Sequence, residues 1–248
     1  MQKRGQITLF VVLGIILISV LAIGLYFKQQ IAVKEASGEI PSLSSLPPDL
    51  ELLKEEISDC TRMVSEEALY FIGQQGGYFL PPDDALPFES YNIALGIKRE
   101  TKTLISEEEL KKEIASYITV ALPGCVDYLT YTNDGLHIFD QAPVIDVKLN
   151  DENTEFSIEY KVTAEKEANT YNLFEPYEIS LPYRVKKVYE STSRIADEIL
   201  QDNAQFDLNQ MLTYNMDLDL YNIANNLMVI AVKDRDENNY EFLFGVAL

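Results

Sequence analysis

The sequence predicts an α+β protein in which one membrane-spanning helix precedes a domain of two cysteine-containing helices, an antiparallel sheet and a further long helix. An uncharged apolar stretch covers residues 9–27. Further along, apolar residues recur at steps of three and four in three segments, as in helices, and at every second residue in others, as in strands.

Residues 9–27 are expected to form the transmembrane helix. At about 1.5 Å per residue they extend about 28 Å, close to the bilayer's hydrocarbon core of about 30 Å. The tail over residues 1–8 carries Lys3 and Arg4, and the positive-inside bias places it in the cytoplasm. We therefore expect a single-pass protein of the cell membrane, with the lipid bilayer as a partner and an extracellular domain over residues 49–248.

Residues 28–48 are expected to continue this helix briefly and then form a linker. Gly38, Pro41 and the pair Pro47–Pro48 interrupt this segment. Glycine and proline both end helices, so the linker holds the domain away from the membrane.

Each of the two helices predicted after the linker contains one cysteine. The first is capped by Asp49 and ends at Gly73, with an apolar face that includes Leu53, Ile57, Cys60, Val64, Ala68 and Phe71. Gly73, Gly76 and Gly77 then predict a tight left-handed turn followed by an extended strand.

The second helix is predicted to begin at Ser106, because Glu109 three residues later completes a capping box. Acids at 107–109 favour the positive end of the helix dipole. The apolar face continues through Leu110, Ile114, Tyr117 and Ala121 to Cys125, with an interruption at Pro123–Gly124.

Cys60 and Cys125 are therefore expected on the buried faces of two helices, in an oxidising exterior where an even number of cysteines usually pairs. Closing a loop of about 65 residues would stabilise the fold by roughly 4 kcal/mol in the chain-entropy model. We predict a disulfide; the alternative is two buried thiols that serve as small apolar side chains.

The remaining segments predict mostly strands. Val144–Leu149 is expected to pair with an alternating strand over 156–162 through a turn at Asn150–Asn153, and a further strand is expected at Tyr177–Tyr183. A long helix follows from about Arg184 to Asn203. Two final strands, Leu227–Lys233 and Tyr240–Val246, flank a polar loop over residues 234–239.

The charge balance argues against some classes of partner. The chain has 40 Asp and Glu against 20 Lys and Arg; removing Lys3, Arg4 and Lys28 leaves 17 bases, a formal charge of −23. Nucleic acid and anionic lipid headgroups require basic surfaces, so neither is an expected partner of the domain. The acids indicate a solvated, self-repelling surface; cation binding or a salty environment is the alternative.

No residue pattern indicates a catalytic, cofactor or metal site. His137, the single histidine, is expected on a strand, and one histidine with two distant cysteines does not predict a zinc site. Asp234, Asp236 and Asn238 have the spacing that begins a calcium loop, but Asn239 and Gly245 replace its required Gly and Glu. We expect an acidic hairpin turn there. A hydrolase using two facing carboxylates remains an open alternative.

The segment Lys3-Arg4-Gly5-Gln6-Ile7-Thr8-Leu9-Phe10 resembles the class III signal of archaeal type IV pilins, with a basic pair, a glycine at the cleavage point and a mature chain beginning with Gln. The resemblance implies that a prepilin peptidase cuts between Gly5 and Gln6. It also implies that the apolar helix serves as membrane anchor and as filament core. More loosely, this start and the cysteine-containing helices resemble membrane-anchored surface proteins of archaea.

These observations together predict a non-enzymatic structural or adhesion protein of the cell surface, in the form of a homo-oligomer or filament subunit. The alternative is a tethered module that binds a solute or a protein partner, for which we expect a concave apolar pocket lined in part by tyrosines.

Overall fold

The computed structural model describes residues 46–133, 135–167, 169–201, 216–235 and 240–248. Pro48–Leu248 form one compact unit. Residues 1–8 and 9–27, together with most of the expected linker, lie outside the described residues, as do Gly5 and Gln6. Within the described part of the chain, no helix is both long enough and apolar enough to cross a membrane.

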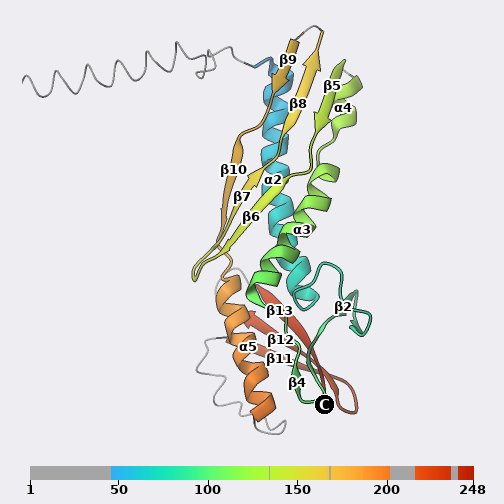
Figure 1. Ribbon diagram of the computed structural model, residues 1–248, viewed down its shortest axis with the longest axis vertical. Coiled ribbons are helices and arrows are strands. Elements are labelled where there is room, and N and C mark those ends of the chain that lie inside the picture. The colour runs from blue at the N-terminus through green and yellow to red at the C-terminus, as the bar shows by residue number, and fades with distance from the viewer. Residues whose placement is uncertain (1–45, 134, 168, 202–215, 236–239) are drawn as a thin grey trace, which may run out of the picture. The chain divides into compact units, whose positions relative to one another are not determined.

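Two long helices lie side by side and form the centre of the unit (Figure 1). Helix α2 covers Pro48–Gln74 and α3 covers Glu107–Cys125. The predicted apolar face of α2 is buried at Leu53, Ile57, Cys60, Val64 and Ala68. Both helices were predicted because their apolar residues follow the helical repeat, and burial of those faces against each other is the consequence.

The ends of these helices differ in part from prediction. Pro48 is the first residue of α2, so Asp49 lies in the first turn instead of capping it, and its carboxylate accepts a hydrogen bond from Lys166 Nζ at 2.6 Å. The capping box of α3 is confirmed: Ser106 Oγ accepts from Glu109 N at 3.3 Å, and Glu109 Oε2 accepts from Ser106 N at 3.2 Å.

Helix α3 also continues through Pro123, where an interruption was expected. Proline at this position removes one helical hydrogen bond, but the last turn is held by burial of Leu122 and by the covalent link at Cys125.

The glycine-rich turn after α2 has the predicted left-handed backbone, with φ of +74° at Gly76 and +95° at Gly77. Helix α2 ends at Gln74, one residue past Gly73. The extended strand expected beyond the turn is absent from residues 78–82. Side chains satisfy the backbone there instead: Glu113 Oε2 accepts from Phe79 N at 2.8 Å, and Gln75 Nε2 donates to the carbonyls of Tyr78 and Phe79.

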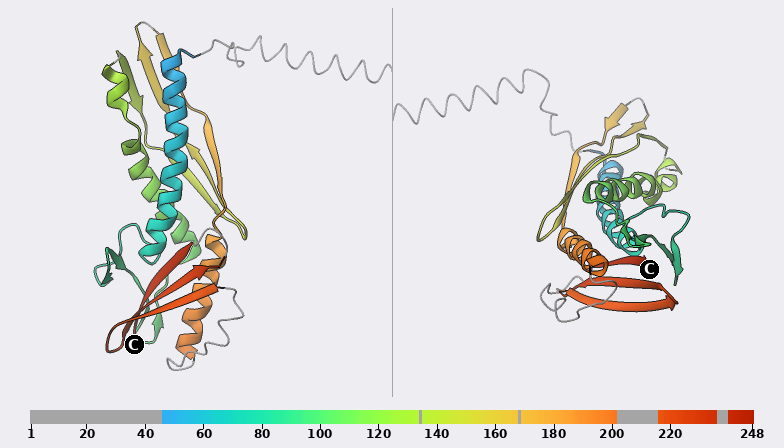
Figure 2. Two further views of the ribbon diagram at one scale, coloured as in Figure 1. Left: turned by 180° about the vertical axis from the view of Figure 1, so that it is seen from behind. Right: turned by 60° about the horizontal axis from the view of Figure 1, so that its bottom comes forward.

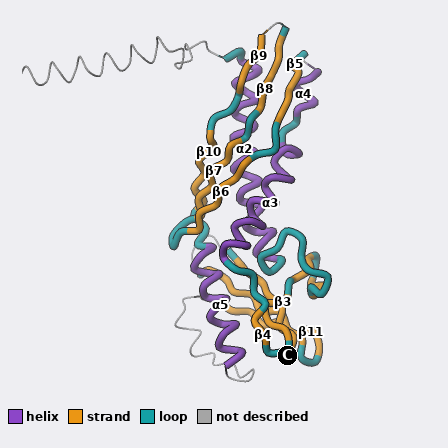
Figure 3. The backbone as a smooth tube through the Cα atoms, in the orientation of Figure 1, coloured by secondary structure: helices purple, strands orange, loops and turns teal. Residues whose placement is uncertain are grey.

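Three long strands, each interrupted near its middle, pack along the helices (Figure 3). One half is the antiparallel sheet β5-β8-β9, formed by Leu136–Asp140, Val162–Lys166 and Asn169–Asn172. The other half is β6-β7-β10, formed by Val144–Leu149, Thr154–Glu159 and Pro176–Leu181. The chain runs directly from β5 into β6, from β7 into β8 and from β9 into β10.

The strand predicted over 156–162 is therefore wrong as a single element, although its alternation is correct. Phe156, Ile158, Tyr160 and Val162 are all buried, as the pattern predicted. The ladder of hydrogen bonds nevertheless stops at residue 159 and resumes at residue 162 in a different sheet. Side-chain alternation persists across the break because the backbone stays extended.

A five-stranded sheet, in the order β11-β12-β13-β3-β4, forms the last layer. The strands are Met216–Ala224, Leu227–Asp234, Glu241–Ala247, Leu95–Lys98 and Thr101–Lys102. Strands β13 and β3 pair in parallel; the other neighbours are antiparallel. The predicted final strands correspond to β12 and β13, whereas β3, β4 and β11 were not predicted.

Both faces of this sheet are covered. Helix α5, Val185–Gln201, matches the predicted long helix in its described part and packs on one face (Figure 2). The hairpin of β1, Leu86–Phe88, and β2, Tyr91–Ile93, packs on the other face, where Ile93 joins Val229, Ala231 and Leu243 in a buried cluster. The unit is thus a mixed α+β fold with several sheets.

Candidate functional site

The interruption of the long strands brings chemically distinct side chains together. Gln141, Ala142 and Pro143 stand opposite only Tyr160 and Lys161, because Asp140 pairs with Val162 and Val144 pairs with Glu159. One strand therefore contains an extra residue, which defines a β-bulge. Bulges bend a strand and redirect its side chains, and they are frequent near functional sites.

A chain of hydroxyl groups lies on the inner side of the interruption. Tyr160 Oη donates to Asp140 Oδ2 at 2.6 Å, and the hydroxyls of Tyr128 and Tyr160 lie 2.7 Å apart. Tyr128 belongs to the short helix α4, Tyr128–Asn133. Burial raises the pKa of Tyr128 to about 12, and it raises the pKa of Tyr160 further, with the Asp140 hydrogen bond adding to the effect. Both phenols therefore stay protonated at neutral pH and act as hydrogen-bond donors.

The two cysteines meet beside this chain. The Sγ atoms of Cys60 and Cys125 lie 2.07 Å apart, the distance of a disulfide bond, and their Cα atoms are 5.8 Å apart. Cys60 is buried as predicted, whereas Cys125, at the end of α3, is partly exposed.

Glu56, one turn before Cys60 on α2, holds the same corner. Its Oε1 accepts from Asp127 N at 2.9 Å, and its Oε2 accepts from Tyr131 Oη at 2.6 Å. The corner between α3 and α4 is thus attached to α2 by one covalent link and two hydrogen bonds.

A hollow of about 270 Å³ opens where the second and third long strands stop pairing. The residues lining it are Glu159, Tyr160, Lys161, Phe174, Glu175 and Pro176. Strand pairing resumes on either side, through the Glu159–Pro176 pair and through a 2.8 Å hydrogen bond from Leu173 N to Val162 O. The Glu175 carboxylate also forms an ion pair with Lys54 on α2, at 2.9 Å. Both apolar and charged side chains therefore line the hollow.

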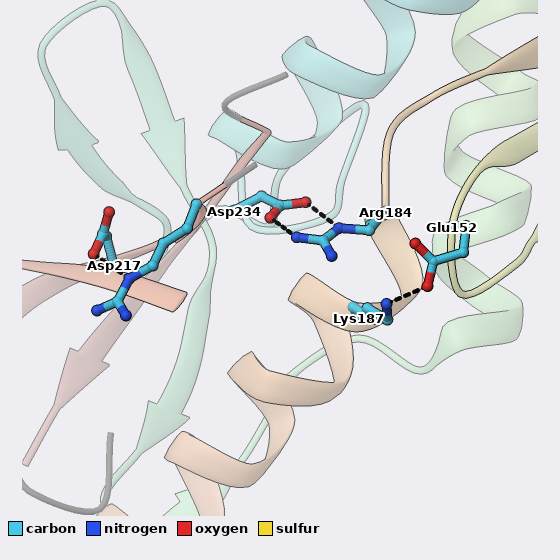
Figure 4. A network of polar contacts seen from close by, with 6 residues as sticks. Glu152, Arg184, Lys187, Asp217 and Asp234 are labelled. Atoms are coloured by element: carbon cyan, nitrogen blue, oxygen red, sulfur yellow. Dashed lines mark hydrogen bonds and ion pairs between the residues drawn. The ribbon is translucent and has the colours of Figure 1, made fainter. Parts of the chain in front are cut away.

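A second polar network joins the start of α5 to the strands (Figure 4). Arg184 Nε donates to Asp234 Oδ2 at 2.8 Å, and a second guanidinium nitrogen contacts Oδ1. Their side chains are 12% and 4% exposed. The neighbouring pairs, Lys187–Glu152 and Lys186–Asp151, join α5 to the turn between β6 and β7. This network is a structural junction between layers.

The position of Asp234 corrects one prediction. We expected it in an acidic hairpin turn over residues 234–239, but Asp234 ends β12, is buried and is bound by Arg184. Residues 236–239, which include Asp236 and Asn238, lie outside the described residues. Among the described residues there is no cluster of three or more His, Cys, Asp or Glu that would hold a metal ion.

The structure therefore brings Cys60 and Cys125 together as predicted and places His137 on β5, also as predicted. Sequence reasoning did not identify the bulge, the Tyr128–Tyr160–Asp140 chain, the hollow or the Arg184–Asp234 pair. Pro143 inside an otherwise strand-like segment was one usable signal, because proline within a sheet is confined to edges and bulges. Comparison with protein family models, curated proteins and solved structures found no match.

Proposed function

We propose that this chain is a single-span, membrane-anchored protein of the cell surface with a structural or adhesive role. The observation that carries the proposal is the Cys60–Cys125 pair at disulfide distance, because structural disulfides persist mainly in oxidising compartments outside the cytoplasm. The basic tail and the apolar segment over 9–27 supply the anchor, with the tail in the cytoplasm.

A structural role agrees with how the polar groups are used. The disulfide, Glu56 and the Arg184–Asp234 pair each join different helices or layers. We assign the chain no catalytic role and no cofactor. The pilin-like start adds the proposal that processing between Gly5 and Gln6 leads to filaments, with other copies of the chain as partners.

Mass spectrometry of the native protein from membranes tests the pilin form. We expect a chain that begins at Gln6 and filaments under the electron microscope, and we expect Gly5→Val to retain the full tail and abolish filaments. Gly14→Val, within the apolar segment but away from the cleavage point, is the matched control and should still be cut. An intact tail on native protein without filaments contradicts the pilin form.

The location has a separate test. A protease added to intact cells should digest the domain over residues 49–248 and leave a cytoplasmic control protein intact. Protection of the domain in intact cells, with digestion only after lysis, would contradict a surface location.

The hollow at the strand interruption favours a second function, a tethered binding module. Its volume of about 270 Å³ and its mixed apolar and charged lining are suited to holding part of a ligand. This role and a structural role are compatible in one chain, because neither the two cysteines nor Glu56 lines the hollow.

A further inference from the structure

The hollow is too small for a whole ligand of ordinary size. Pockets that enclose a drug-sized molecule measure about 300 to 1,000 Å³. The hollow measures about 270 Å³ and is open to solvent on one side. It is therefore suited to a single side chain or a comparably small group.

Exposed apolar surface extends beyond the hollow. Phe174, which lines it, is 51% exposed. Val144 and Pro176 are the direct neighbours of Glu159 on the two adjacent strands, and residues paired in this way share one face of the sheet. Val144 is 67% exposed. This exposed apolar surface extends around the hollow, and a macromolecule could cover it whereas a small solute could not. It therefore indicates a macromolecular partner.

The charged residues around the hollow influence which side chain it would bind. Three charged side chains line the hollow, those of Glu159, Glu175 and Lys161. Glu175 already pairs with Lys54, but Glu159 has no ion pair within the described part of the chain. A cationic group that enters the hollow would meet the Glu159 carboxylate, which takes part in no ion pair among the described residues, and it would be opposed by the charge of Lys161.

We propose that this hollow receives an arginine side chain presented by a partner protein. A guanidinium group stacks on an aromatic face such as that of Phe174 and binds a carboxylate through two parallel hydrogen bonds, which an ammonium group cannot do. The partner's surface around that arginine would cover Val144 and Pro176. The partner would carry a positively charged surface there, which complements the formal charge of −20 on this chain. The inference deepens the proposed binding module and rests on it.

The test uses the full chain in lipid nanodiscs, with 4-fluorophenylalanine in place of its 11 phenylalanines. The Phe174 fluorine signal is assigned by its loss in Phe174→Leu. The probes are two blocked peptides, Gly-Arg-Gly and Gly-citrulline-Gly, which differ by the charge of one side chain of nearly the same shape. We expect the arginine peptide to shift the Phe174 signal saturably, with a millimolar dissociation constant, and the citrulline peptide to bind at least about tenfold more weakly.

Variants test the charge argument in both directions. Glu159→Gln should weaken binding about fivefold, and Lys161→Gln should strengthen it by a similar factor. Glu165→Gln is the matched control: Glu165 is an exposed acid on β8 that does not line the hollow, so the same change of charge there should leave binding unchanged.

Equal binding of the two peptides, or equal weakening by Glu159→Gln and Glu165→Gln, would overturn the proposal, as would the absence of any shift at Phe174. None of these results would affect the anchored structural role, which is tested by processing, filaments and protease access.

Discussion

The Arg184–Asp234 pair shows how one buried contact joins two layers. Removing charged groups from water is costly, and the cost is offset only when the opposite charge and its hydrogen bonds are in place. Here the guanidinium donates to both carboxylate oxygens while both side chains are nearly excluded from solvent. Removal of either residue would deprive the other, a charged group in the interior, of this charge-paired contact.

We therefore expect Asp234→Ala to lower the free energy of unfolding by about 3 to 5 kcal/mol. The double variant Arg184→Met/Asp234→Leu should lose clearly less, because both charges of the pair are removed together. The exposed pair Arg235–Asp217, with N and O atoms 2.7 Å apart, is the control: Asp217→Ala should cost no more than about 1 kcal/mol. Urea denaturation measures the free energy of unfolding of all three variants. Equal losses for Asp234→Ala and Asp217→Ala would contradict the larger stabilising effect expected of the buried pair.

The glycine turn after α2 leaves least room for a side chain at Gly77. Gly77 has a φ of +95°, and a Cβ added there would lie 2.5 Å from Ile105 Cγ2. Position 77 therefore requires glycine for two reasons: the backbone has a positive φ, and a side chain would collide with Ile105.

Gly77→Ala should destabilise the fold by more than about 1 kcal/mol, since alanine is unfavourable at positive φ and would also displace Ile105. Gly124→Ala is the matched control, because Gly124 lies in α3 with no atom within 4 Å of an added Cβ. That change should be neutral or stabilising by up to about 1 kcal/mol. Thermal denaturation distinguishes the two, and a neutral Gly77→Ala would show that the turn can adjust.

Between elements, the Cys60–Cys125 link and Glu56 hold α2 to the corner of α3 and α4. The link joins residues 65 positions apart, so it restricts the unfolded chain strongly. Because Glu56 holds the same corner independently, loss of the disulfide should weaken the fold without abolishing it.

We expect Cys60→Ser/Cys125→Ser to lower the free energy of unfolding by about 2 to 4 kcal/mol while the circular dichroism spectrum stays native. A reducing agent should bring the unmodified protein to the stability of the variant and leave the variant itself unchanged. Free-thiol labelling of both cysteines in the native protein would contradict the link.

Over the whole unit, many tyrosines are buried at contacts between layers. The pKa values of Tyr117, Tyr131 and Tyr177 are raised to about 12, mainly by burial, and hydrogen bonding to Glu67 at Tyr117 and to Glu56 at Tyr131 contributes to the increase. Burial raises the pKa of Tyr183 and Tyr240 further still, and at Tyr183 the hydrogen bond to Glu66 adds to the effect. The folded state therefore favours the protonated phenols.

Stability should decline at alkaline pH as a result. Groups with a raised pKa in the folded state contribute fully below the unfolded value of 10.0 and lose that contribution as the pH rises toward the folded values. Because the chain has no tryptophan, tyrosinate absorbance reports this directly. We expect a fraction of the 15 tyrosines to ionise only upon unfolding. Titration of all of them near pH 10 in the folded protein would contradict the burial argument.

Local patterns account for the elements that were predicted. Helices α2, α3 and α5 and strands β6, β10, β12 and β13 follow from apolar repeats that can be read within a short window. The capping box at Ser106 and the turn at Asn150–Asn153, where Asn150 N donates to Asn153 O at 2.9 Å, are equally local. The short strands β1 to β4 lack such a repeat.

By itself, the sequence determined the mixed α+β class, the main helices, the alternation through Tyr160 and the pairing of the only two cysteines, because each depends on residue type and on periodicity along the chain. Only the tertiary structure decided the parallel pairing of β3 with β13, the bulge at Gln141–Pro143, the hollow and the burial of Asp234 against Arg184. These features join residues far apart in the chain. Their stability comes from packing and charge pairing between distant segments, which leave no periodic trace in either segment.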